Sequence, residues 1–95
     1  MNPAKVDRAK VRRLTDLPNV GEAAAADLRR LGITRPAQLA GGDPRALYDR
    51  LCVLTGARHD PCVLDVFISI VRFMDGEDPK PWWAYTDERK RTHAL

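Results

Sequence analysis

The sequence predicts an all-α fold of five helices followed by a short aromatic C-terminal tail. Apolar residues recur at helical spacing along several stretches, so that each stretch can bury one stripe. The pairs Asp43-Pro44 and Asp60-Pro61 combine a capping residue with a proline suited to the first helical position, and each starts a helix. Because 95 residues suffice for one hydrophobic core, we expect a single domain over residues 1–95.

The composition limits the classes of protein to which this chain can belong. Hydrophobic residues make up 44% and charged residues 31%, which is typical of a soluble globular chain. The longest apolar run, residues 66–74, contains Ser69 and Arg72, so no membrane-spanning segment and no membrane partner are expected. Residues 1–13 are basic without an apolar block, which predicts no secretory signal. Two cysteines without a secretory route then indicate reduced thiols and a cytoplasmic location.

The first predicted helix covers residues 4–14, with Asn2 as its cap and Pro3 at the first position. This part of the chain is strongly basic, whereas the net charge of the whole is only +3. On a helix, Lys5, Arg8 and Arg12 would share one face. Two interpretations remain open: a solvated surface, or a face turned toward an acidic partner.

A tight corner follows at residues 17–21, and the rest of the chain is arranged around it. Pro18 fixes its own φ and disfavours a helical Leu17, so the incoming helix must stop. Asn19 and Gly21 are residue types that tolerate positive φ, which a chain needs to reverse within a few residues.

The second predicted helix, residues 22–31, begins directly after the corner. Its apolar stripe consists of Val20, Ala24, Leu28 and Leu31. Gly32 ends it at a position where left-handed geometry favours glycine. Its run of four alanines favours helix and permits close approach of a neighbouring helix.

Three further helices are expected. A short one opens near Pro36 and runs to residue 40 within a connector. The fourth starts at Asp43-Pro44 and ends at Gly56, with a stripe formed by Leu47, Leu51 and Leu54.

The fifth helix, from Asp60-Pro61 to residue 74, is the most apolar. Either the other helices surround it at the centre of the core or part of it forms a dimer interface, and the first is favoured in a single domain of this size. Its polar residues Asp65, Ser69 and Arg72 fall at helical spacing and predict a narrow solvent-exposed strip. In the tail, Thr86 is expected to cap a last short helix through Arg91.

The corner resembles a known motif. Leu17-Pro18-Asn19-Val20-Gly21, followed by Ala25 and Leu28, looks like the helix-hairpin-helix DNA-binding motif. Further positions resemble small bacterial proteins of the pathogenicity-locus, or mitomycin-resistance-type, family: Leu31-Gly32-Ile33, Leu51-Cys52, Arg58-His59-Asp60-Pro61-Cys62 and Pro81-Trp82-Trp83. The resemblance implies a tandem helix-hairpin-helix domain that acts on DNA. Its parts would be a first motif in residues 1–33, a connector in 34–42, a degenerate second motif in 43–76 and a tail in 77–95.

The expected function is sequence-independent nucleic-acid binding, accessory to DNA repair, recombination or uptake. Free backbone amides at the start of the second helix would bind phosphate, and basic side chains would add charge. The candidate contact residues are Pro18, Asn19, Val20, Gly21, Glu22, Arg8, Arg12, Arg13 and Arg29. The partner would be duplex or single-stranded DNA, and a DNA-repair or recombination protein is a second expected partner.

Three departures from the motif weaken this interpretation. Ala23 stands where DNA-binding members usually have lysine or arginine. The carboxylate of Glu22 competes with phosphate for the same amides, and Asn19 adds a side chain where the motif has glycine. The alternative is therefore a protein–protein interaction module with the same fold and no direct DNA contact.

Other chemistry receives less support. Cys52, His59 and Cys62 are close enough in sequence to suggest zinc, but their spacing matches no common zinc module, and buried thiols are favoured. An exposed Cys62 at a helix start would have a lowered thiol pKa. No cofactor or metal is expected, and no catalytic motif appears, so the chain is interpreted as a non-enzyme. Trp82 and Trp83 allow two functions, sealing the core or stacking on bases, and the first is favoured.

Overall fold

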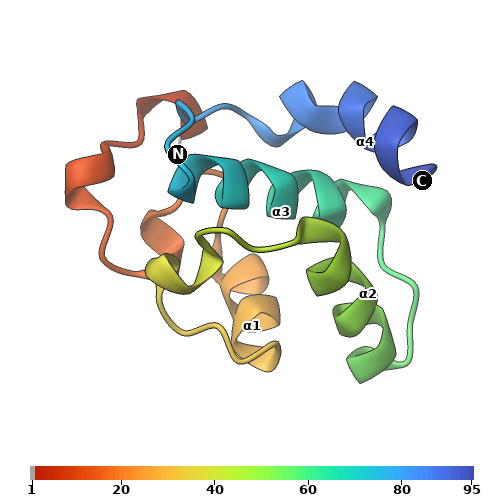
Figure 1. Cartoon of the computed structure of the whole chain (residues 1–95). Coiled ribbons are helices and arrows are strands. Elements are labelled where there is room, and N and C mark those ends of the chain that lie inside the picture. Colours follow the sequence, from red (N-terminus) through yellow and green to blue (C-terminus); the bar gives the residue numbers. More distant parts are fainter. Residues whose placement is uncertain (1) are drawn as a thin grey trace.

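A computed structural model describes residues 2–95, and Met1, the first residue of the predicted basic segment, lies outside them. Within residues 2–95 the fold is all-helical, with no strand (Figure 1). The α-helices are α1 (Glu22–Arg30), α2 (Pro44–Thr55), α3 (Pro61–Met74) and α4 (Thr86–His93). Short 3-10 helices are η1 (Pro3–Lys5), η2 (Arg8–Lys10), η3 (Leu14–Asp16), η4 (Pro36–Leu39) and η5 (Trp82–Tyr85). Among these residues no helix is long and apolar enough to cross a membrane.

Helix α3 forms the centre of the core, as predicted. In Figure 1 it runs across the middle of the molecule, with α1 and α2 on one side and α4 on the other. The side chain of Asp60 accepts a hydrogen bond from the Cys62 amide at 2.9 Å and so starts the helix. Its most deeply buried apolar residues are Leu64, Phe67, Ile68, Ile70, Val71 and Phe73. An apolar helix of this kind must be covered on several sides, which explains why the flanking segments pack against it.

The predicted solvent-exposed strip on α3 is wrong. Asp65 is 0% exposed and Ser69 is 2% exposed, while Arg72 is half-buried. Asp65 accepts hydrogen bonds from Arg89 Nε at 2.7 Å and from the Thr86 hydroxyl at 2.9 Å. The buried carboxylate therefore has both a charge partner and a hydrogen-bond donor in α4, which attaches α4 to the core. Thr86 thus binds Asp65 rather than capping the last helix, which ends at His93 instead of at the predicted residue 91.

The predicted first helix, residues 4–14, is also wrong. Instead, the chain forms η1, η2 and η3, separated by extended residues. Local side-chain bonds explain this difference, because the Asp7 carboxylate accepts from the Ala9 amide and the Asp16 carboxylate accepts from the amides at positions 12 and 13. Only Leu14 of the three short helices is buried, so packing does not enforce a continuous helix.

The elements from α1 to α2 follow the prediction closely. Gly32 has a φ of +83° after α1, and Gly56 has a φ of +66° after α2. The Asp43 side chain accepts from the amides of Arg45 and Ala46 at the start of α2. The connector helix is η4, a 3-10 helix. Among residues 2–95, three of the five predicted helices are therefore α-helices (α1, α2 and α3), the first and the connector are replaced by 3-10 helices, and the fourth α-helix, α4, lies in the tail. The predicted stripe on α2 is only partly correct, because Leu54 is 57% exposed.

The aromatic tail buries one residue of η5 in the core. Tyr85 is 4% exposed, Trp82 is half-buried and Trp83 is 62% exposed. The Tyr85 hydroxyl donates a 2.8 Å hydrogen bond to the Glu77 carboxylate, and Arg72 of α3 also contacts Glu77, at 3.3 Å. Core sealing, favoured for both tryptophans, is therefore performed mainly by Tyr85.

Candidate nucleic-acid interface

The corner at residues 17–21 joins η3 to α1 and is anchored by apolar side chains. Leu17 is 0% exposed and Val20 is 4% exposed, and Pro18 is also buried. Of these residues, only the backbone is available to a ligand. Pro18 and Val20 therefore hold the loop in place rather than offer side chains to nucleic acid.

Asn19 has the positive φ that the sequence suggested, at +67°, whereas Gly21 does not. Gly21 lies at φ −98° and ψ −167°, an extended conformation open to every residue type, so the expectation of a left-handed Gly21 is wrong. A Cβ atom at Gly21 would meet nothing within 4 Å. Neither backbone strain nor packing thus requires glycine here, and the open space lies on the solvent side of the corner.

The Asn19 side chain turns inward and connects three parts of the chain. Its Nδ2 donates to the Ser69 hydroxyl of α3 at 3.0 Å and to the Lys80 carbonyl at 2.8 Å. Its Oδ1 accepts from the Trp82 amide at 3.1 Å. The side chain therefore does not project toward a ligand on the solvent side. The sequence signalled the turn at Asn19 but gave no indication of these partners, which lie at least fifty positions away.

The N-terminus of α1 presents backbone amides with no acceptor among residues 2–95. The first hydrogen bond of the helix runs from the Ala25 amide to the Gly21 carbonyl at 2.9 Å. The amides of Gly21, Glu22 and Ala23 precede it, and no side chain caps this helix. Glu22 is exposed, and its carboxylate does not fold back onto these donors. The positive end of the α1 dipole is thus open to an anion.

The predicted basic contacts are not gathered at the corner. Arg8 donates to the Phe73 carbonyl and to the Glu77 carbonyl, and its guanidinium lies 4.0 Å from the centre of the Phe73 ring. It therefore stabilises the C-terminal end of α3.

The other three arginines remain at the surface. Arg12 donates to the Ala9 carbonyl at 2.9 Å, and Arg13 lies 3.7 Å from the Asp16 carboxylate. Arg29 is exposed on the last turn of α1, and its side chain makes no ion pair or hydrogen bond with residues 2–95. Arg13 and Arg29 are thus the most available charges of the predicted set.

A groove lies beside the exposed amides. Its volume is about 560 Å³, and its walls come from the corner, the start of α1 and the beginning of η5. The lining residues are Pro3, Thr15, Asn19, Val20, Gly21, Glu22, Trp82 and Trp83. Residues with unsatisfied backbone donors, Gly21 and Glu22, and the two tryptophans therefore line the same groove.

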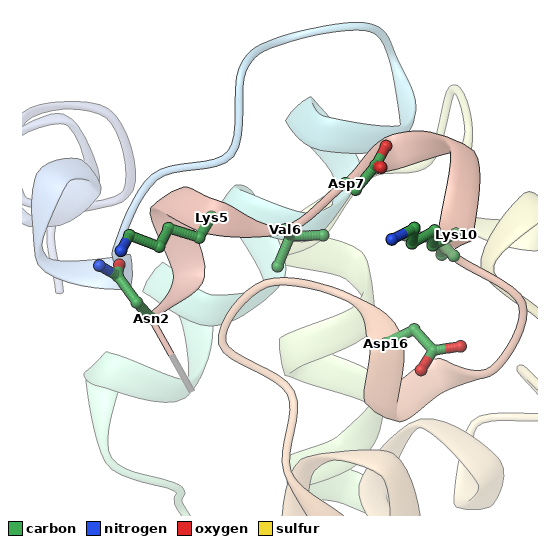
Figure 2. Close-up of a pocket in the computed structure, with 7 residues that line it drawn as sticks. Asn2, Lys5, Val6, Asp7, Lys10 and Asp16 are labelled. Carbon is green, nitrogen blue, oxygen red and sulfur yellow. The ribbon is translucent and has the colours of Figure 1, made fainter.

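A second pocket, of about 360 Å³, lies among the N-terminal 3-10 helices (Figure 2). Lys5 and Lys10 line it together with the carboxylates of Asp7 and Asp16. Hydrogen bonds from the backbone amides of Arg13 and Arg12 hold the pKa of Asp16 below its usual value, so this carboxylate stays ionised. The charges in this pocket are mixed, and both carboxylates already accept hydrogen bonds from backbone amides. We therefore interpret the pocket as part of the packing of the N-terminal segment and not as a ligand site.

The region around Cys52 and Cys62 shows no metal-site geometry. Among residues 2–95, no group of three histidine, cysteine or acidic side chains is placed to hold a metal ion. Both thiols are free and half-buried. Burial, together with a hydrogen bond to Asp60, raises the pKa of the Cys62 thiol. The condition for a low-pKa reactive thiol, an exposed Cys62, is not met.

The fold is that of a small all-helical protein with an open helix N-terminus beside an aromatic groove. A family model described as "Cdd1: Pathogenicity locus" matches residues 7–91, and the chain belongs to this family. The chain is also similar to a protein of Streptomyces lavendulae described as "Mitomycin resistance protein McrB". The two are 49% identical over 81 residues, which cover 85% of this chain and 77% of the relative. No solved structure matches the chain.

Proposed function

We propose that this protein binds nucleic acid without sequence preference, through the backbone amides at the N-terminus of α1. The observation that carries the proposal is the set of donors at Gly21, Glu22 and Ala23, which have no acceptor among residues 2–95. A phosphate oxygen is the natural acceptor for such donors at the positive end of a helix. Contact of this kind reads no base, so the binding is sequence-independent.

In this proposal the corner and α1 form the phosphate-binding half of a helix-hairpin-helix motif. The short helix η3 stands where the motif has its first helix, and the buried Leu17 and Val20 fix the loop against the core. Helices α2 and α3, joined through residues 56–60, would form the degenerate second motif. The second connection lacks the proline and glycine pattern of the first, so phosphate contact is assigned to the first corner alone.

The few free charges of the predicted contact set predict weak binding that weakens further as the salt concentration rises. Arg13 and Arg29 are available to phosphate, while Glu22 adds a repelling carboxylate at the first turn of α1. Each phosphate neutralised contributes a slope of about 0.9 to the fall of log affinity with log salt on duplex DNA. With few such contacts, we expect affinities in the micromolar range or weaker.

The proposed cellular role is that of an accessory factor in DNA repair, recombination or uptake, in the cytoplasm and without catalysis. The relative from Streptomyces lavendulae is described as a mitomycin resistance protein. We propose that a contribution of this chain to such resistance would follow from its binding to nucleic acid.

A protein-interaction module is the second candidate, and one surface favours it. Val53 is 79% exposed and Leu54 is 57% exposed, side by side in sequence at the end of α2. They line a shallow apolar depression of about 290 Å³ with Asp49 and Arg50. Adjacent exposed apolar residues of this kind are common at sites of protein contact.

Substitutions at Gly21 test the phosphate site directly. Gly21 is the N-cap of α1, and its extended backbone with open space around it accepts a larger residue. In Gly21→Asp the new carboxylate accepts hydrogen bonds from the α1 amides and repels phosphate. We expect binding to labelled DNA, measured by fluorescence anisotropy at low salt, to weaken by about tenfold or more. The free energy of unfolding should stay the same or rise by up to about 1 kcal/mol.

Two further variants serve as controls. Gly21→Ala keeps the amides free and should bind DNA like the unmodified protein. Glu22→Gln removes the repelling carboxylate and should bind more tightly. If Gly21→Asp and Gly21→Ala bind equally well, the phosphate site lies elsewhere. If the unmodified protein binds neither duplex nor single-stranded DNA at low salt, the interaction module becomes the better proposal.

A further inference from the structure

The groove beside the corner contains an aromatic ring whose exposure the fold does not explain. Trp83 is 62% exposed although it lies in the same short helix as Tyr85, which is 4% exposed. Burying a large aromatic side chain stabilises a small domain considerably, so an indole left in solvent forgoes that stabilisation. Tyr85 already seals this part of the core, and Trp83 is therefore free for another role.

The position of Trp83 is fixed by the residues around it. Its ring contacts the Trp82 ring in a T-shaped arrangement, with centroids 5.5 Å apart and planes at 83°. The Trp82 amide donates to Asn19 Oδ1 at 3.1 Å, and Asn19 belongs to the corner. The exposed indole is thus held relative to the corner through two successive contacts. A ring held in this way loses little freedom when a ligand stacks on it.

We propose that Trp83 is a stacking surface for an unpaired base, so that the groove binds single-stranded nucleic acid in preference to duplex. This inference rests on the proposed function, because the phosphate of the bound strand would contact the amides at Gly21 and Glu22. Both these residues and Trp83 line the same groove of about 560 Å³, a size typical of sites for small ligands such as one nucleotide.

The chemistry of the groove selects a single strand. Within a duplex, the faces of each base are covered by neighbouring bases, and only the phosphates and the base edges are accessible. An unpaired base offers a face to an indole ring, and such stacking is largely independent of sequence. The combination of backbone donors with an exposed tryptophan therefore fits a strand that presents phosphates and open base faces together.

The test compares a labelled oligothymidylate with a duplex of equal length, at low salt, by fluorescence anisotropy. Trp83→Ala should bind the single strand about 5- to 150-fold more weakly, while duplex binding changes little. Leu54→Ala is the matched control, since Leu54 is also exposed, at 57%, but lies in α2 away from the groove. Its binding should equal that of the unmodified protein.

A second measurement does not depend on how well Trp83→Ala folds. Oligothymidylate should quench the tryptophan emission of the unmodified protein, and the quenching should be much smaller in Trp83→Phe, where only Trp82 emits. Trp83→Phe keeps an aromatic ring and should retain most of the affinity for the single strand. Equal quenching in the two proteins would overturn the inference.

The outcomes separate this inference from the proposed function. If the protein binds duplex and single strand equally and Trp83→Ala changes neither, the stacking surface is rejected while phosphate binding stands. If Trp83→Ala weakens both substrates by the same factor, the preference for a single strand is rejected. If no DNA binds at low salt even to the unmodified protein, the proposed function fails, and the inference fails with it.

Discussion

Replacing Asn19 tests how the corner is attached to α3 and to the tail. Helix-hairpin-helix proteins usually have glycine at this position, so Asn19→Gly looks like a conservative change toward the motif. In the structure Asn19 combines a φ of +67° with three hydrogen bonds to Ser69, Lys80 and Trp82. Asn19→Gly retains the backbone geometry and removes all three bonds. We therefore expect it to destabilise the protein.

The size of the effect follows from the contacts. A typical hydrogen bond contributes about 0.5–1.5 kcal/mol net, so three contribute about 1.5–4.5 kcal/mol. Since the bond to the Lys80 carbonyl is exposed, the lower part of this range, about 1.5–3 kcal/mol, is the better expectation. Glycine relieves the left-handed backbone but adds freedom to the unfolded chain, and these effects, each about 1 kcal/mol, roughly offset. Alanine tolerates left-handed backbone less well than asparagine does, so Asn19→Ala should be about 1 kcal/mol less stable than Asn19→Gly.

Urea unfolding followed by circular dichroism measures the change in stability, and limited proteolysis reports on the tail. Because two of the three bonds hold residues 80 and 82, the tail of Asn19→Gly should be cleaved sooner than that of the unmodified protein. A free energy of unfolding within about 0.5 kcal/mol of the unmodified protein would refute the reasoning. It would mean that the three hydrogen bonds are exchanged for water at no cost.

Two further predictions concern the polar groups that hold the tail. Arg89→Met leaves the carboxylate of Asp65, 0% exposed, without its guanidinium, and should lower the free energy of unfolding by about 3–5 kcal/mol. Adding Asp65→Leu should recover much of this loss in urea unfolding, whereas additive losses would contradict the pairing. For Glu77, burial alone would raise the pKa, but hydrogen bonds from Tyr85, Lys80 and Arg72 lower it below its ordinary value of 4.5. Its stabilising contribution is therefore complete above pH 4.5 and is lost as the pH falls through the lower folded value, so the stability difference from Glu77→Gln should shrink in acid.

Local signals in the sequence were sufficient for α1, α2 and α3. Each of these helices has an unambiguous boundary: Asp43-Pro44 and Asp60-Pro61 cap and start two of them, and Gly32 and Gly56 end two in left-handed geometry. Such signals depend on residues within one turn of the chain, which is why they can be read without knowledge of the fold.

The sequence of the N-terminal segment does not contain enough local information to predict its structure. Its residues have helical propensity and a basic pattern, but only Leu14 in its three short helices is buried. Asp7 and Asp16 instead bind nearby amides and stabilise separate 3-10 helices. A periodic pattern predicts a helix only where tertiary packing supports it, and here little packing does.

The second wrong prediction from the sequence is the solvent-exposed strip on α3. The buried polar residues of this strip also connect the fold to the candidate site. Polar residues at helical spacing usually face solvent, but Asp65 faces Arg89, and Ser69 accepts a hydrogen bond from Asn19. The two contacts lie one turn apart on α3, and together they attach the last helix and the corner to the same strip. The groove depends on the contact at Asn19, because Asn19 also accepts a hydrogen bond from the Trp82 amide and thereby holds the tail against the corner. The departure from glycine at Asn19, which weakens the resemblance to the DNA-binding motif, is thus the feature that assembles the aromatic side of the groove.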